Sequence, residues 1–193
     1  MSELELDPRV ERSRRVIGDA TLELLAEVGY GALTVEGVAK RAGVGKSTIY
    51  RHWESKLDLV TDAIATLKPP VDDDPTPRPF RERVERHLRG VRDVLADSRW
   101  ARVLPAVIDA AVRHDEVARW HTGYAHARRR TMTELLAEGV ADGSLPADAD
   151  VELLGDLLLG PIFLRRLMLR EHLDDETIAA AVRAVLGDGT GAR

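Results

Sequence analysis

Apolar residues recur three and four positions apart along most of the chain, which has 193 residues. An α-helix turns once every 3.6 residues, so this spacing gathers apolar side chains on one face of a helix. The first example is formed by Ile17, Ala20, Thr21, Leu24 and Val28. No window alternates apolar and polar residues over the length of a strand. The pattern therefore predicts an all-α protein without a sheet.

Helix caps and breakers divide the sequence into a series of predicted helices. Thr34 is a suitable N-cap for the second helix, and Ser55 with Asp58 three positions later resembles a capping box that opens the fourth. The predicted helices span about residues 9–28, 34–42, 46–53, 55–67, 80–96, 99–113, 116–142, 150–170 and 175–186.

A proline-rich segment marks the predicted boundary between two domains. Lys68 to Pro79 holds five of the nine prolines and a run of aspartates, and proline cannot continue a helix. We therefore expect an N-terminal domain over residues 9–68 and a C-terminal helical domain over residues 80–187.

Composition argues against several classes of function. The chain has no cysteine, which removes disulfides, thiolate metal sites and thiol catalysis. His121 and His126 stand about 140° apart around a helix and form no chelating pair, and no arrangement of serine, histidine and carboxylate indicates a triad. The polar start lacks the apolar core of a secretory signal, and the longest apolar stretch, Leu153 to Leu169, is interrupted by Asp156 and two arginines. We expect a cytoplasmic protein that is no enzyme, spans no membrane and uses no metal or cofactor.

The stretch Gly45-Lys46-Ser47-Thr48 matches the end of a nucleotide-binding loop. The full loop, G-x-x-x-x-G-K-[ST], needs a glycine five residues before Gly45 and must follow a β-strand. Lys40 stands at that position, and the preceding TVEGVAKRA has helical spacing. A nucleotide-hydrolysing enzyme, which would bind nucleotide with magnesium, is therefore the weaker interpretation.

Two short predicted helices separated by Ala42-Gly43-Val44-Gly45 match instead a helix-turn-helix over about residues 34–53. In this motif a tight turn sets the second helix across the first so that it can enter the DNA major groove. On the predicted helix over residues 46–53, Ile49 and Trp53 share one face, which we expect to lie in the core.

The other faces of this helix carry the residues predicted to contact DNA. Hydroxyl groups and a guanidinium can reach base edges, whereas flanking cationic and ring side chains suit phosphates. Ser47, Thr48 and Arg51 are assigned to bases, and Lys46, Tyr50, His52, Lys56 and the helix start at Thr34 to phosphates. On spacing alone, Tyr50 and His52 could equally be incidental surface groups.

The distribution of charge agrees with DNA binding although the net charge of the chain is −5. Between Thr34 and Lys56 there are five basic and two acidic residues, a net +3, so the rest of the chain carries −8. For nucleic-acid binding, the place where positive charge is concentrated matters more than the total.

The segment TVEGVAKRAGVGKSTIYRHWESKLDLV, from Thr34 to Val60, closely resembles the DNA-binding region of the TetR (tetracycline repressor) family. The shared features are the Ala-Gly-Val turn, the Tyr-x-His-aromatic end of the recognition helix and the Ser-Lys start of the next helix. Many members of that family have serine in place of Gly45 and phenylalanine in place of Trp53.

The resemblance implies a homodimeric transcription regulator, by default a repressor. Its three-helix DNA-binding domain would bind a palindromic operator of double-stranded DNA, and a fourth helix would join it to a C-terminal helical domain that binds a small-molecule effector and dimerises. It also favours phosphate contact for Tyr50 and His52. The fourth helix carries Lys56 at its DNA end and Ile64 and Leu67 at its core end, so we expect an effector to act by shifting it.

Two sets of C-terminal residues are candidates for these roles. An effector pocket is predicted at Trp100, Trp120, Tyr124 and Phe163, although aromatic residues are more often plain core. The predicted helix over residues 150–170 is apolar nearly all round, which indicates a second partner. The predicted dimer interface, a four-helix bundle, consists of Leu154, Leu158, Ile162, Ile178, Val182 and Val185. The alternatives are burial within one subunit, and a helical module that dimerises without touching DNA.

Overall fold

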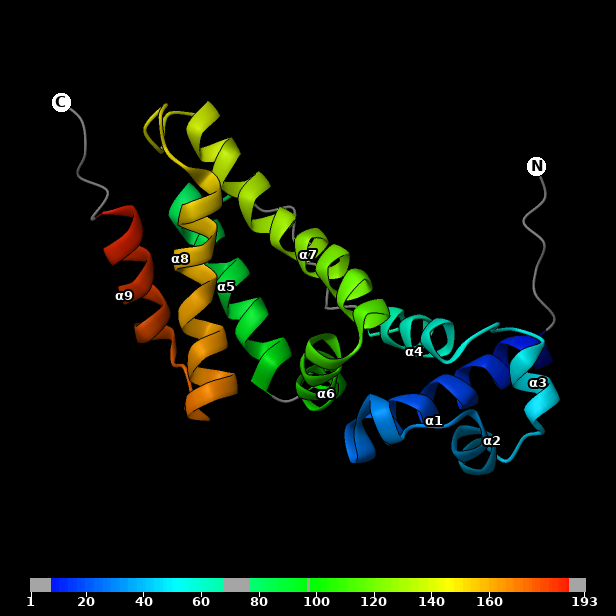
Figure 1. Ribbon diagram of the computed structural model, residues 1–193. Helices are drawn as coiled ribbons and strands as arrows, with labels where there is room; N and C mark the ends of the chain where they lie inside the picture. The colour runs from blue at the N-terminus through cyan, green and yellow to red at the C-terminus, as the bar shows by residue number, and fades with distance from the viewer. Residues whose placement is uncertain (1–7, 68–76, 97, 188–193) are drawn as a thin grey trace, which may run out of the picture. The chain divides into compact units, whose positions relative to one another are not determined.

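The computed structural model describes residues 8–67, 77–96 and 98–187, and these residues form helices and connecting turns without a strand (Figure 1). The helices are α1 (Pro8–Ala32), α2 (Val35–Ala42), α3 (Lys46–Tyr50), α4 (Lys56–Ala65), α5 (Phe80–Ala96), α6 (Arg99–Arg113), α7 (Asp115–Ala141), α8 (Val151–Phe163), the π-helix η1 (Leu164–Leu169) and α9 (Asp175–Leu186). The all-α prediction is confirmed. Among the described residues, no helix is both long enough and apolar enough to cross a membrane.

The helices group into two compact units. Unit 1 combines residues 1–69 with residues 99–121, and unit 2 combines residues 70–98 with residues 122–193. The sequence prediction assigned residues 99–121 to the C-terminal domain. They lie in unit 1 because α6 packs against α1 with an apolar face made of Val103, Leu104, Val107 and Ala110, and the predicted domain bounds stay a prediction.

In unit 1, α1 is the central helix and packs against α2, α4 and α6. Ile17 and Ala20 are buried as predicted, and Leu22 and Leu25 are buried with them, whereas Val28 is 48% exposed. Thr21 is buried as predicted, and its hydroxyl donates to the carbonyl oxygen of Ile17 at 2.8 Å. Hydrogen bonding of this kind removes most of the cost of burying a polar group.

The C-terminal end of α1 is irregular at Gly29, whose φ of 74° and ψ of 169° interrupt the helix. Glycine reaches positive φ without the steric cost that a Cβ would add. The sequence prediction ended this helix at Val28, and the structure adds a final turn that reaches Ala32. Tyr30 lies in that turn, with 3% of its surface exposed.

In unit 2, α5, α8 and α9 pack side by side (Figure 1). Their contacts bury Val84 and Leu88 of α5, Leu158 and Ile162 of α8, and Ile178 and Val182 of α9. These apolar faces follow the helical periodicity read from the sequence. Phe80 at the start of α5 lies so close to Gly139 of α7 that a Cβ at Gly139 would come within 2.4 Å of its ring.

The predicted single helix over residues 150–170 is divided into an α-helix and a π-helix. Asp150 caps the start of α8 by accepting from the amides of Glu152 and Leu153 at 3.1 and 3.0 Å. The α-helical pattern ends at Phe163, two residues after Pro161, and η1 continues to Leu169. Arg170 then adopts a left-handed conformation with φ 56° and ψ 34°. It is the one described residue other than glycine with a positive φ.

Candidate nucleic-acid interface

A short turn joins α2 to α3 and is built by local hydrogen bonds. The hydroxyl of Thr34 accepts from the amide of Gly37 at 3.0 Å, which caps α2 as predicted. Gly43 ends α2 in the left-handed region, with φ 68° and ψ 31°, and the amide of Val44 donates to the carbonyl oxygen of Ala39 at 3.0 Å. A helix precedes Gly45 where a nucleotide loop requires a strand, so Gly45-Lys46-Ser47-Thr48 lacks the structural context of that loop.

The inner face of α3 is fixed to unit 1 as the sequence predicts. Ile49 is 1% exposed and Trp53 is 5% exposed. The indole Nε1 of Trp53 donates to Oδ2 of Asp62 in α4 at 2.9 Å, and the same oxygen accepts from Arg14 of α1 at 3.0 Å. The segment from Lys46 to Trp53 therefore cannot rotate without losing the apolar contacts of Ile49 and Trp53 and the hydrogen bond from Trp53 to Asp62.

The helix itself is shorter than predicted, since α3 ends at Tyr50 rather than near Trp53. A hydrogen-bonded turn continues it, in which the amides of His52 and Trp53 both donate to the carbonyl oxygen of Ile49, at 2.9 and 3.0 Å. This turn keeps Trp53 on the same side as Ile49, so the inward face is preserved without a regular final turn.

The side chains assigned to DNA lie on the outside of this segment. Lys46, Ser47, Tyr50 and Arg51 are exposed, as is Thr34, whereas Thr48, His52 and Lys56 are half-buried. Tyr50 is 55% exposed, an unusual environment for a large aromatic side chain. The arrangement offers hydroxyl, guanidinium and ammonium groups to an external partner. Contact with DNA itself stays a prediction.

Lys46 is paired with a carboxylate that the sequence did not indicate. Its Nζ lies 2.7 Å from Oε1 of Glu36 in α2, and both side chains are more than half exposed. The hydrogen bond from Lys46 lowers the pKa of Glu36, and the same bond raises the pKa of Lys46. The ammonium group of Lys46 is therefore already paired with a carboxylate on the outside of α2.

Lys56 is held against the end of α1. Its Nζ donates to the carbonyl oxygen of Tyr30 at 2.9 Å and lies 4.1 Å from the centroid of the Tyr30 ring. An ammonium group has three donors, so this bond uses one of them. The sequence assigns Lys56 to a phosphate, which stays a prediction, and the structure adds its contact with Tyr30.

Tyr30 connects this anchor to the beginning of α7. Its hydroxyl donates to Oε1 of Glu116 at 3.2 Å, and its ring meets the ring of His114 edge-on with centroids 5.1 Å apart. Burial, followed by the hydrogen bond to Glu116, raises the pKa of Tyr30 to about 12. Tyr30 therefore keeps its proton at neutral pH and remains a donor. Sequence reasoning missed this residue because Glu116 is 86 positions away.

The residues predicted to line an effector pocket are divided between the two units. Trp100 and Trp120 belong to unit 1, and Tyr124 and Phe163 belong to unit 2. The first three are half-buried, and Phe163 is 38% exposed. A pocket within unit 2 is lined by neither Tyr124 nor Phe163. An effector pocket formed by these four residues stays a prediction.

The residues predicted to form a dimer interface occupy two environments. Four of them are buried within the chain itself, with exposed fractions of 1% for Leu158, 2% for Ile162, 1% for Ile178 and 0% for Val182. These four are core residues of unit 2 rather than interface residues, because α5, α8 and α9 cover one another. Leu154 and Val185 are half-buried.

A different set of apolar residues remains on the outside of α8 and η1. Leu153, Leu157, Leu164 and Met168 are 54%, 49%, 53% and 75% exposed. Their separations of four and seven positions put them along one side of a helix. The periodicity of a helix that is apolar all round could not distinguish this side from the buried one.

Comparison with protein families gives matches over both parts of the chain. Residues 17–63 match the model described as bacterial regulatory proteins, tetR family. Residues 78–185 match the model described as tetracyclin repressor-like, C-terminal domain.

Individual proteins are similar over most of their length. The HTH-type transcriptional regulator YdeS of Bacillus subtilis (strain 168) is 33% identical over 89% of this chain and 86% of its own. The HTH-type transcriptional repressor KstR of Rhodococcus jostii (strain RHA1) is 26% identical over 93% of this chain and 71% of its own.

Solved structures share the fold. The TetR family transcription regulator SCO0332 is 30% identical with a TM-score of 0.63, over 94% of this chain and 100% of that chain. MexZ, a repressor responsible for antibiotic resistance in Pseudomonas aeruginosa, has a TM-score of 0.74 at 22% identity, over 94% of this chain and 96% of that chain.

Proposed function

The chain belongs to the TetR family of bacterial transcriptional regulators, and we propose that it represses transcription by binding a palindromic operator as a homodimer that a small-molecule effector releases. One observation carries the DNA-binding part of this proposal. The segment from Lys46 to Trp53 buries Ile49 and Trp53 and turns its hydroxyl, guanidinium and ammonium groups outward.

We assign the reading of bases to the exposed side of α3. Arg51 can form two parallel hydrogen bonds with the O6 and N7 acceptors of guanine, and the hydroxyls of Ser47 and Thr48 can reach neighbouring base edges. The hydrogen bond between Trp53 and Asp62 supports these roles, because a recognition helix must keep its orientation to discriminate between bases.

The remaining assigned residues are proposed to hold the phosphates. Tyr50, His52 and the α2 start at Thr34 would flank the groove, and Lys46 and Lys56 would supply positive charge. Lys46 would exchange Glu36 for a phosphate oxygen on binding. Since phosphate neutralisation releases counterions, the affinity for DNA should fall steeply as salt increases.

Dimerisation is proposed to use the exposed side of α8 and η1. Leu153, Leu157, Leu164 and Met168 form an apolar strip that a second copy of the chain would cover, and the half-buried Leu154 and Val185 are assigned to the same interface. Paired helices of two subunits would form a four-helix bundle. Two recognition helices then contact half-sites about 34–36 Å apart, one turn of B-DNA.

Release by an effector is proposed to act through the contacts of Tyr30. Lys56 at the DNA end of α4 contacts Tyr30, and Tyr30 contacts Glu116 in the first turn of α7. A ligand that displaces α7 would break the bond to Glu116 and loosen the position of α4. Binding of effector and operator would then be thermodynamically coupled, with each lowering the affinity for the other.

The test is fluorescence anisotropy with a labelled duplex from the region upstream of the protein's own gene, compared with an unrelated duplex of the same length. We expect at least about 10³-fold tighter binding to the upstream duplex. Arg51→Ala should reduce this preference, whereas Arg113→Ala, which removes an exposed arginine of α6, should leave it unchanged. Equal affinity of the wild type for both duplexes would contradict the proposal for this operator region.

A further inference from the structure

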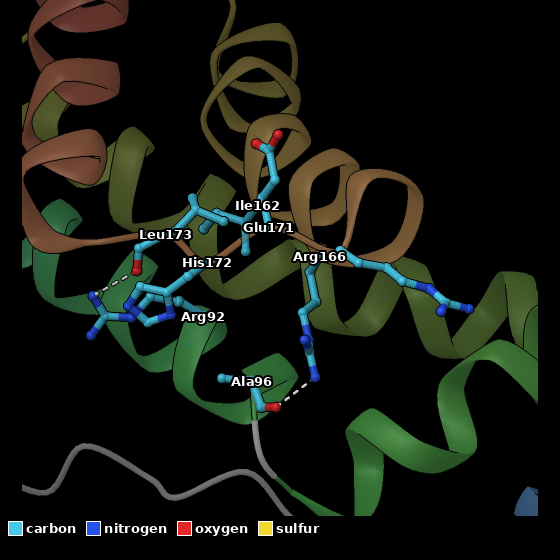
Figure 2. Close-up of a pocket in the computed structure, with 8 residues that line it drawn as sticks. Arg92, Ala96, Ile162, Arg166, Glu171, His172 and Leu173 are labelled. Atoms are coloured by element: carbon cyan, nitrogen blue, oxygen red, sulfur yellow. Dashed lines mark hydrogen bonds between the residues drawn. The ribbon is translucent and has the colours of Figure 1, made fainter.

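Unit 2 contains a pocket of about 200 Å³ whose wall is rich in arginine (Figure 2). It lies between the end of α5, the end of α8 with η1, and the segment that leads to α9. Its lining consists of Arg92, Ala96, Ile162, Arg166, Arg170, Glu171, His172 and Leu173.

The pocket is positively charged in a protein that is acidic as a whole. Its lining has three arginines and one glutamate, which gives +2 with His172 neutral, whereas the chain carries −5. Glu171 faces Arg165, with its Oε2 3.6 Å from Nη1 of an arginine that is not part of the lining. The single acidic side chain of the wall therefore does not neutralise the arginines inside it.

Arg166 is held in place without losing its charge. It donates from Nε to the carbonyl oxygen of Leu95 and from Nη2 to that of Ala96 at 2.6 Å, at the last residues of α5 (Figure 2). A carbonyl oxygen carries no formal charge, and no described carboxylate pairs with Arg166. Its Nη1 bonds to no residue that the structure describes. The guanidinium is thus already ordered and still able to donate to a ligand.

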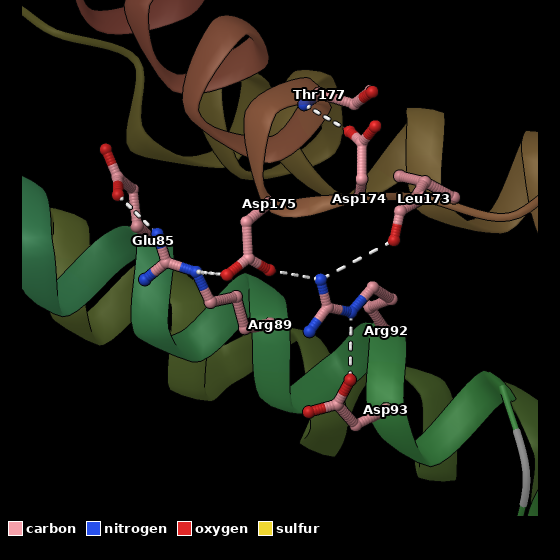
Figure 3. Close-up of polar contacts among 8 residues, drawn as sticks. All are labelled: Glu85, Arg89, Arg92, Asp93, Leu173, Asp174, Asp175 and Thr177. Atoms are coloured by element: carbon pink, nitrogen blue, oxygen red, sulfur yellow. Dashed lines mark hydrogen bonds and ion pairs between the residues drawn. The ribbon is translucent and has the colours of Figure 1, made fainter.

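Arg92 forms the opposite wall and is fixed by α9 (Figure 3). It donates to Asp175, to Asp93 at 2.8 Å and to the carbonyl oxygen of Leu173 at 3.5 Å. Asp175 also lies 3.4 Å from Nε of Arg89, so the carboxylate ties two arginines of α5 to the start of α9. Arg92 therefore shapes the pocket, and its charge is largely compensated.

Arg170 adds a second uncompensated cation. Its side chain is exposed and forms no hydrogen bond or ion pair with any residue in the described ranges. Its backbone is left-handed, with φ 56°, at the end of a π-helix. Both features cost conformational energy and are frequent at functional sites. The irregular turn brings Arg166 and Arg170 into one lining.

We propose that this pocket binds a small organic anion through a carboxylate or phosphate group. Arginine suits both because its planar N–H groups match pairs of oxygen atoms. Ala96, Ile162 and Leu173 offer apolar contact to a short carbon skeleton. The volume lies below the roughly 300–1,000 Å³ of pockets for drug-sized ligands, so the ligand is small. Trp100, Trp120, Tyr124 and Phe163 take no part in this site.

Isothermal titration calorimetry of the full chain tests the proposal with succinate and inorganic phosphate as probes, at constant ionic strength set by chloride. We expect a dissociation constant of about 1 mM or lower for at least one probe. Binding of succinate alone identifies a carboxylate site, and binding of phosphate alone a phosphate site. Absence of binding by both probes overturns the proposal. No DNA is needed, so this failure would leave operator binding unaffected.

Three variants separate a specific site from general charge. Arg166→Gln should weaken binding of the probe at least tenfold, and Arg170→Gln, which breaks no described contact, at least threefold. The matched control is Arg183→Gln, since it removes the same charge from an exposed position of α9 in the same unit, outside the lining, and should leave affinity unchanged. Equal weakening by all three variants overturns the proposal. Should Arg166→Gln fail to fold, the comparison of Arg170→Gln with Arg183→Gln decides.

Discussion

The ammonium group of Lys56 lies 4.1 Å from the centroid of the Tyr30 ring and donates to the Tyr30 carbonyl oxygen at 2.9 Å. This pair joins the start of α4, next to the proposed DNA-binding surface, to the end of α1. Tyr30 continues the connection to Glu116 in α7 through its hydroxyl. The residue proposed to bind phosphate is therefore in contact with the residue proposed to report the position of α7.

Replacement of Tyr30 by phenylalanine tests the second half of this connection. Tyr30→Phe keeps the ring under Lys56 and removes the hydrogen bond to Glu116, so we expect a loss of about 1 kcal/mol in the free energy of unfolding. Because the pKa of Tyr30 is raised to about 12, its contribution is complete below pH of about 10 and is lost as the pH rises toward 12. Urea unfolding at a series of pH values should show the difference between wild type and variant shrinking over that range. A constant difference would contradict this role of the hydroxyl.

The pairing of Glu36 with Lys46 predicts tighter DNA binding when the carboxylate is removed. Glu36→Gln should increase affinity for operator and unrelated duplexes alike, by about two- to fivefold, since Lys46 no longer exchanges an ionic partner. Anisotropy titrations at several salt concentrations measure this effect. The control is Glu27→Gln, which removes a similarly exposed carboxylate of α1 that pairs with Arg41 of α2. A similar gain in both variants would indicate net charge rather than the Lys46 pair.

Residues assigned to bases and residues assigned to phosphates should differ in their effects. Arg51→Ala should reduce discrimination at one operator position by about 1–3 kcal/mol, whereas Tyr50→Ala should weaken binding to all sequences by a similar factor. Binding to a panel of single-base operator variants separates the two outcomes. An unchanged panel profile in Arg51→Ala would remove that residue from the base-reading set.

Two neighbouring glycines of the turn should respond in opposite directions. Gly43 has φ 68°, so Gly43→Ala should lower the free energy of unfolding by about 1–2 kcal/mol. Gly45 is extended, with φ −73°, and caps α3 without a side chain. Gly45→Ser should therefore raise the free energy of unfolding by about 0.3 kcal/mol. Thermal unfolding measures both, and destabilisation by serine would contradict the cap geometry.

The exposed strip on α8 predicts the effect of a charge on assembly. Leu157→Asp should convert the dimer to a monomer in sedimentation velocity and weaken operator binding, because a buried unpaired carboxylate opposes association. Val112→Asp is the control, since Val112 is 83% exposed on α6 of unit 1. Dimers that persist in Leu157→Asp would place the interface elsewhere.

The sequence by itself determined the helical elements and the inward face of the recognition segment. The bounds of α5, α6 and α9 match the predicted ranges, and Thr34 and Ser55 form the predicted caps. Ile49 and Trp53 are buried as their spacing indicated. These features depend on hydrogen bonds and apolar periodicity within a few turns of a helix, so residues that are close in the sequence are enough to determine them.

Only the tertiary structure decided which elements pack together and which charges meet. It joined α6 to α1, covered one side of α8 while leaving Leu157 outside, and paired Lys46 with Glu36. It also brought Arg92 and Arg166, which are 74 positions apart, into one pocket. A helix that is apolar all round has no preferred side of its own, and the partner of a charge is set by the folded path of the chain. Local sequence patterns therefore determine neither the buried side of α8 nor the partners of the charged residues.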